Sequence, residues 1–130
     1  MSPEKQTSCA CGGSVTLLLP CSGAADTGEI ADRAARKFAK GGCAGMFCLA
    51  GIGANISGFL ASAKGADRLL VVDGCNLECA RKTLVEKGIT ENIIHVRLSD
   101  LGFVKGKSPA TDERIDVVVT ELGKRLTASL

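Results

Sequence analysis

Short apolar runs alternate along the chain with longer segments whose apolar residues recur about every three to four positions. The bare apolar runs are typical of strands buried on both faces, and the periodic segments are typical of amphipathic helices. We expect strands at 15–19, 43–47, 68–72 and 93–98. We expect helices at about 26–40, 52–63, 76–87 and 112–126, with Gly residues close to several helix ends.

Strands that alternate with helices predict a parallel sheet covered by helices on both faces. The chain has 130 residues, which suits one domain with its own core. We therefore expect a small doubly wound α/β domain at 14–130, a Rossmann-like or flavodoxin-like three-layer sandwich, behind a flexible arm at 1–13. The four parallel strands are expected in the order 2-1-3-4 with right-handed crossovers. The polar segment 99–110 is read as a surface loop, with a lid as the less favoured alternative.

Four cysteines are placed so that this topology would bring them together. Cys21, Cys48 and Cys75 each follow one of the first three expected strands. The carboxyl ends of parallel strands meet at one edge of the sheet, where ligands bind, and neighbouring strands lie about 5 Å apart. Cys79 follows Cys75 by four positions, so a helix through both would present them on one face. The sequence therefore predicts a cluster of four thiols.

Four thiolates suit tetrahedral Zn²⁺ or the iron of an iron–sulfur cluster, whereas Mg²⁺ and Ca²⁺ prefer oxygen. Helix N-termini after the strands would help to offset the negative charge. Gly51, Gly53 and Gly74 would let backbone amides approach the sulfurs, and Asp73 would be either an acceptor that orients the site or a helix cap. The alternative for each cysteine is a small buried apolar side chain.

For the remaining cysteines and the single histidine, the favoured interpretation is a role other than metal binding. Cys43 is expected at the start of the second strand, about 15 Å from Cys48, and is therefore read as structural. Cys9 and Cys11 lie in the expected arm, with an accessory thiol pair as the minority alternative. His95 is read as a packed or edge side chain of the fourth strand rather than a ligand.

Composition argues against several classes of partner. Aromatic residues make up 3% of the chain and the net charge is +2, so the sequence offers neither stacking platforms nor a basic patch for nucleic acid. No apolar run is long enough to span a bilayer, and the first residues do not resemble a signal peptide. A cytoplasmic protein with reduced thiols is expected, with a metal ion as its partner, no nucleic acid or membrane, and a protein partner left unspecified.

The sequence resembles the DGC-domain family of zinc-binding proteins in three motifs. These are Asp73-Gly74-Cys75 followed by Cys79, Cys21-Ser22-Gly23, and Cys48-Leu49-Ala50-Gly51-Ile52-Gly53. The resemblance covers roughly residues 15 to 103. It implies four chelating cysteines, which fall on Cys21, Cys48, Cys75 and Cys79, and it brings no settled reaction.

Three functions remain open from the sequence. The first is a zinc-binding protein with a structural or metal-carrier role. The second is a thiol-dependent enzyme or redox protein in which three cysteines hold zinc and Cys21 or Cys79 reacts. The third is an iron–sulfur protein, and no catalytic constellation is complete for any of them.

Phosphate and nucleotide motifs are incomplete in this sequence. The segment from Cys21 to Thr27 is similar to the cysteine loop of small phosphatases and arsenate reductases, but Thr27 stands where that loop needs arginine. A dinucleotide fingerprint is broken by Ile56, and the P-loop spacing lacks its Lys-Ser/Thr pair after Gly58.

Overall fold

The computed structural model describes residues 14–21 and 23–129, so the expected arm at 1–13, with Cys9 and Cys11, lies outside the described residues. Within them, the chain forms a four-stranded, all-parallel sheet in the order β2-β1-β3-β4, as the sequence predicts. The strands are β1 (Thr16–Pro20), β2 (Gly45–Met46), β3 (Arg68–Asp73) and β4 (Ile93–Arg97).

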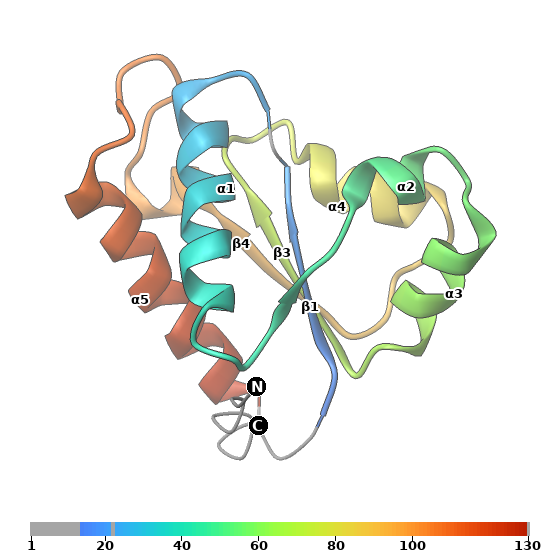
Figure 1. The fold of residues 1–130 in the computed structure, drawn as a ribbon. Helices are drawn as coiled ribbons and strands as arrows, with labels where there is room; N and C mark the ends of the chain where they lie inside the picture. Colours follow the sequence, from blue (N-terminus) through green and yellow to red (C-terminus); the bar gives the residue numbers. More distant parts are fainter. Residues whose placement is uncertain (1–13, 22, 130) are drawn as a thin grey trace.

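Helices cover both faces of this sheet, which confirms the predicted three-layer α/β fold (Figure 1). One face carries α1 (Asp26–Ala39) and α5 (Asp112–Ala128). The other face carries α2 (Leu49–Gly53), α3 (Ser57–Gly65) and α4 (Cys79–Glu86), and a 3₁₀ turn, η2 (Leu98–Leu101), follows β4. Among the described residues, no helix combines the length and the apolar character needed to cross a membrane.

β3 is apolar without alternation because it is paired on both sides and covered on both faces. Leu70 and Val72 point to the layer of α1 and α5, whereas Leu69 and Val71 point to the layer of α2, α3 and α4. All four side chains are at most 1% exposed. The segment that follows β3 is therefore anchored by the most buried part of the molecule.

The second strand is shorter than the predicted 43–47, because regular pairing is limited to Gly45–Met46. These two residues pair with Leu17 and Leu18 of β1. The glycine turn that ends the preceding helix, with Gly42 at φ 91°, continues through position 43, and the chain enters α2 already at Leu49. Cys43 therefore lies in the turn before β2 rather than in a strand.

The helix predicted over 52–63 is divided into α2 and α3. Asn55 takes φ 63°, a left-handed conformation that a continuing helix cannot contain and that Asn tolerates better than most residues. Ile56, which falls inside the predicted helix, is 48% exposed at the N-cap of α3. The apolar periodicity that predicts a single helix therefore continues through a segment that forms a turn in the structure.

The helix predicted over 76–87 begins three residues later, at Cys79. Glu78 takes φ 56° just before it, and Leu77 is 58% exposed. Cys75 consequently lies in a turn, and the prediction that Cys75 and Cys79 share one helix face is wrong. The physical reason is the position of the Asp73 carboxylate, which binds the backbone amides at the start of α4.

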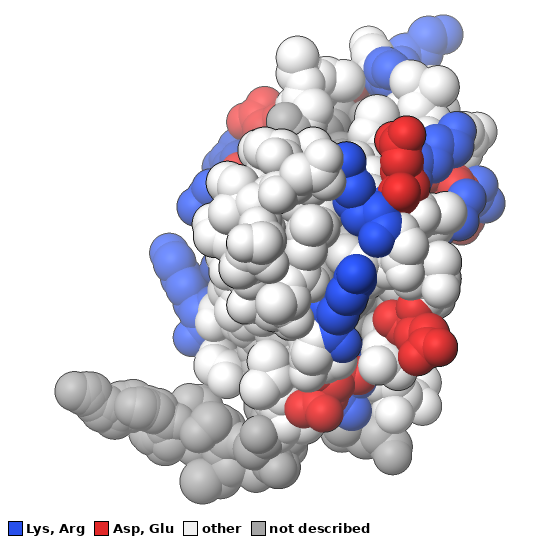
Figure 2. Space-filling model, turned by 90° about the vertical axis from the view of Figure 1, so that its right-hand side faces the viewer, with Lys and Arg blue, Asp and Glu red and all other residues white. Residues whose placement is uncertain are grey.

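The face seen in Figure 2 carries charges of both signs, scattered around a broad area of uncharged residues. No single-sign patch dominates this face, in keeping with the 16 basic and 14 acidic residues of the whole chain.

Candidate functional site

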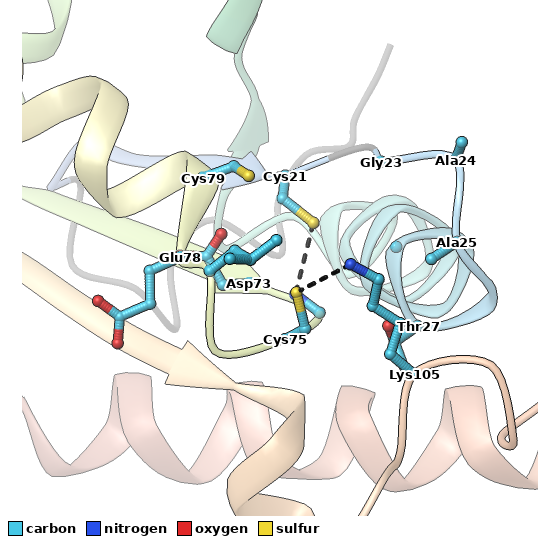
Figure 3. A pocket seen from close by; sticks show the side chains of 13 residues that line it. Cys21, Gly23, Ala24, Ala25, Thr27, Asp73, Cys75, Glu78, Cys79 and Lys105 are labelled. Atoms are coloured by element: carbon cyan, nitrogen blue, oxygen red, sulfur yellow. Dashed lines mark hydrogen bonds between the residues drawn. The ribbon is translucent and has the colours of Figure 1, made fainter.

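A cavity of about 270 Å³ opens at the carboxyl ends of β1 and β3, beside the N-termini of α1 and α4 (Figure 3). This is the edge of the sheet at which ligands bind in open α/β proteins. The walls come from three segments that are far apart in the sequence. The lining residues are Cys21, Gly23, Ala24, Ala25, Thr27, Gly28, Asp73, Gly74, Cys75, Leu77, Glu78, Cys79 and Lys105.

Cys21 directly follows β1 and is held in place by the neighbouring strand. Its backbone amide donates to the Val72 carbonyl oxygen at 2.9 Å, which extends the β1–β3 pairing by one residue. Its Sγ accepts a hydrogen bond from the Gly74 amide at 3.4 Å. The sulfur is therefore oriented by the backbone of the DGC segment.

Cys75 lies in the turn after β3, and its side chain points toward that of Cys21 (Figure 3). The Lys105 ammonium lies 3.8 Å from the Cys75 Sγ. Cys79, the first residue of α4, lines the same cavity and is exposed. Three of the four predicted cysteines thus border one cavity, all as free thiols.

Cys48 lies apart from this cavity. Its Sγ accepts a hydrogen bond from the Gly51 amide at 3.4 Å and so caps α2. It borders a separate hollow with Met46 and Phe47. Gly51 is required there, because a Cβ atom would lie 1.8 Å from the Phe59 ring. Gly51 and Gly53 therefore belong to the turn around Cys48 rather than to the cavity.

Asp73 is 1% exposed and joins three parts of the structure. Its Oδ1 accepts from the Ala80 amide at 2.8 Å, and its Oδ2 accepts from the Arg81 amide at 3.2 Å. The Oδ2 also lies 2.8 Å from the Nε2 of His95. Asp73 thus caps α4 from a distance, which combines features of both readings made from the sequence. The pairing with His95 was missed, although parallel β3 and β4 in register place both residues on one face.

Gly74 is the contact point between the end of β3 and the start of α1. A Cβ atom at Gly74 would lie 2.8 Å from the Thr27 carbonyl oxygen and 2.9 Å from the Gly28 nitrogen. Only glycine permits this approach, which brings the N-terminus of α1 against the DGC segment.

The segment 102–110 is attached to the N-terminus of α1 through Asp26. The Asp26 carboxylate accepts from the amides of Gly106 at 2.8 Å and Ser108 at 3.0 Å. The hydrogen bond from Gly106 lowers the pKa of Asp26 below its ordinary value, and the bonds from Ser108 and Thr27 act in the same direction. The segment brings Lys105 to the cavity wall, which sequence reasoning did not find.

Glu78 is neutralised beside the cavity by two arginines. Its Oε1 accepts from the Arg81 Nε at 2.8 Å, and its Oε2 accepts from Arg97 at 3.0 Å. The hydrogen bond from Arg81 lowers the pKa of Glu78, and desolvation opposes it only in part. This carboxylate is therefore already engaged on the side of α4 and β4.

The donor set of the cavity fits a thiophilic metal by its chemistry, since Cys21, Cys75 and Cys79 offer three sulfurs and Zn²⁺ favours thiolate ligands. In the arrangement of residues 14–21 and 23–129, however, no three His, Cys, Asp or Glu side chains are grouped closely enough to hold one ion. A metal site would thus need the sulfurs to converge.

The chain is thus an α/β protein with three free cysteines around a cavity at the carboxyl edge of its parallel sheet. The DGC domain family matches residues 17–122, and the chain belongs to this family. A similar protein is the anaerobic and virulence modulator AnvM of Pseudomonas aeruginosa, 28% identical over 89 residues, which are 68% of this chain and 67% of that protein. No solved structure matches the chain.

Proposed function

We propose that this chain is a zinc-binding protein whose metal is held by Cys21, Cys75 and Cys79. The observation that carries the proposal is their common cavity: three thiols from segments up to 58 positions apart border one space of about 270 Å³. A chance distribution of small apolar side chains would not favour one edge of the sheet. The match to the DGC domain family over residues 17–122, a range that includes all three cysteines, adds support.

Three protein ligands leave one position of a tetrahedral zinc site for a further ligand. Cys48, which caps α2 outside the cavity, is the fourth ligand expected from the sequence. Recruiting it would require the turn at the start of α2 to move and the bond from Gly51 to Cys48 to break. When bound, zinc would supply a positive charge that holds the thiolates together. A site from which the metal can be transferred suits a carrier.

The test is metal content per chain, by elemental mass spectrometry, in protein purified without oxygen or chelators. We expect about one zinc in the wild type and a loss of zinc in Cys75→Ser. The matched control is Cys43→Ser, which changes a disulfide-bonded cysteine outside the cavity and should leave the metal content of the folded chain unchanged. Equal loss from both variants contradicts the proposal, and iron with acid-labile sulfide would redirect it to an iron–sulfur protein.

Cys48→Ser then decides the ligand number. Retained zinc supports three cysteine ligands with an open position, whereas lost zinc shows that Cys48 joins the site.

A second candidate is thiol chemistry at Cys75, favoured by the Lys105 ammonium 3.8 Å from its sulfur and by the facing Cys21. The Cys75 sulfur would be the attacking group, and Cys21 stands where a resolving thiol would be needed. Metal-free protein with rapid, selective alkylation of Cys75 by iodoacetamide would favour this candidate over zinc binding.

A further inference from the structure

We infer that the α1 side of the cysteine cavity is a binding site for a small oxyanion, of which inorganic phosphate is the simplest probe. The inference goes beyond zinc binding and does not depend on it, because it is carried by hydrogen-bond donors rather than by thiols. It concerns Thr27, Gly28 and Lys105, which line the cavity. Thr27 and Lys105 lie on the side of the cavity away from α4 (Figure 3).

The first observation is a buried hydroxyl with no acceptor. Thr27 is 1% exposed and lines the cavity, and its hydroxyl forms no hydrogen bond with any residue that the structure describes. Buried polar groups are almost always hydrogen-bonded, so an unmatched hydroxyl on a cavity wall indicates a partner that binds there.

The second observation is the N-terminus of α1, a helix of 14 residues. Its N-cap is Ala25, whose side chain cannot accept a hydrogen bond from the first turn. Gly28 is buried and lines the cavity, and its backbone amide has no acceptor within the described part of the chain. Free amides at the positive end of a helix form a favourable place for an anion.

The third observation is the cation, Lys105, the one Lys or Arg on the described wall of the cavity. The phosphatase-like segment from Cys21 to Thr27 lacks its arginine because Thr27 stands in that position. Lys105 reaches the same cavity from another segment, which the Asp26 carboxylate holds against α1. The structure thus supplies from elsewhere the positive charge that the motif lacks.

The nearby carboxylates do not compete for these donors. Asp73 is occupied by the amides of α4 and by His95, and Glu78 by two arginines. Asp26 is occupied by the amides of Thr27, Gly106 and Ser108, so the Thr27 amide is not one of these donors.

The Lys105 ammonium donates to the Cys75 sulfur at 3.8 Å and has two further N–H groups. An acceptor with several oxygens around one centre matches a hydroxyl, an amide and an ammonium from residues that line one cavity.

The experiment is a titration of the full chain with inorganic phosphate, followed by amide chemical shifts in two-dimensional NMR, with chloride at matched ionic strength as the control. We expect saturable shifts centred on Thr27, Gly28 and Lys105. Shifts reproduced by chloride, or saturable shifts centred elsewhere, would overturn the inference.

Variants sharpen the test. Lys105→Met should weaken phosphate binding by about tenfold or more, because it removes a charged hydrogen-bond donor. Lys107→Met is the matched control, since this residue belongs to the same segment but not to the cavity wall, and it should bind like the wild type. Thr27→Val, nearly equal in shape, should also weaken binding. Equal losses from Lys105→Met and Lys107→Met would show general charge attraction and refute the site.

The two proposals can fail separately. About one zinc per chain without saturable phosphate binding removes the oxyanion site alone. Saturable phosphate binding without any zinc removes the zinc proposal alone.

Discussion

Asp73 connects the buried end of β3 to the first amides of α4 and to His95. A carboxylate accepts all these hydrogen bonds, whereas an amide in its place would direct an NH₂ group at one of the donors. The first turn of α4, and with it Cys79, therefore depends on a residue seven positions from the helix amide that it caps.

We predict that Asp73→Asn lowers the free energy of unfolding by about 1–3 kcal/mol, the cost of leaving a buried donor without a partner. Urea denaturation measures the loss, and hydrogen exchange should rise at Ala80 and Arg81 before it rises in β3. Asp100→Asn, an exposed carboxylate, is the control and should change little. A rise in hydrogen exchange that is equal along the whole chain would show that Asp73 has no particular role at α4.

At the scale of elements, the segment 102–110 and α1 are connected by the Asp26 carboxylate. The bonds donated by Gly106 and Ser108 favour the ionised form, so the pKa of Asp26 is lower in the folded chain than the ordinary value of 3.8. A lowered pKa stabilises the fold above the unfolded value and loses that contribution as the pH falls through the folded value. The attachment should therefore be complete at neutral pH and fail only in acid.

We predict that the difference in thermal stability between the wild type and Asp26→Asn is constant near neutral pH and disappears as the pH falls below about 3.8. Thermal denaturation across this pH range measures it. Chemical shifts of the Gly106 and Ser108 amides should follow the same titration. A stability difference that instead grows in acid would show that the hydrogen bonds to Asp26 do not favour its ionised form.

Element types and the strand order followed from sequence patterns, because β3 is uniformly apolar and the helices are strongly periodic. The residues at which individual helices begin and end could not be predicted from these patterns. The start of α4 depends on hydrogen bonds from Asp73, and the end of α2 depends on the left-handed Asn55, neither of which alters apolar periodicity. These effects act through single polar residues.

The cavity could be predicted in part from the expected strand order. Topology predicts that Cys21 and Cys75 follow neighbouring strands, and the structure places both on one cavity wall. The expected position of Cys48 required its side chain to face that cavity, whereas the sulfur is used locally by the Gly51 amide. Lys105 was invisible because its position depends on Asp26, about 80 residues earlier.

At the scale of the molecule, the sheet separates two apolar layers, and only one end of the sheet carries the cavity. Leu122 of α5 is fully buried in the layer shared with α1 and does not itself line the cavity. Global stability and metal binding should therefore respond to different substitutions.

We predict that Leu122→Ala lowers the free energy of unfolding by about 2–5 kcal/mol, through lost apolar burial and the space left behind. The folded fraction should retain the zinc content of the wild type, measured per folded chain. Val117→Ala, on the same helix and 49% exposed, is the control and should stay within about 0.5 kcal/mol of the wild type. Loss of zinc from folded Leu122→Ala would show that the layers are coupled.

The two outer strands of the sheet also affect how this protein behaves at high concentration. A long, open edge strand invites a strand from another molecule and so promotes aggregation. β2 pairs over only two residues, which leaves little regular backbone at that edge. At the other edge, the Arg125 side chain donates to the His95 carbonyl oxygen at 2.8 Å and occupies one acceptor of β4. Intermolecular strand addition is thereby disfavoured at both edges of the sheet.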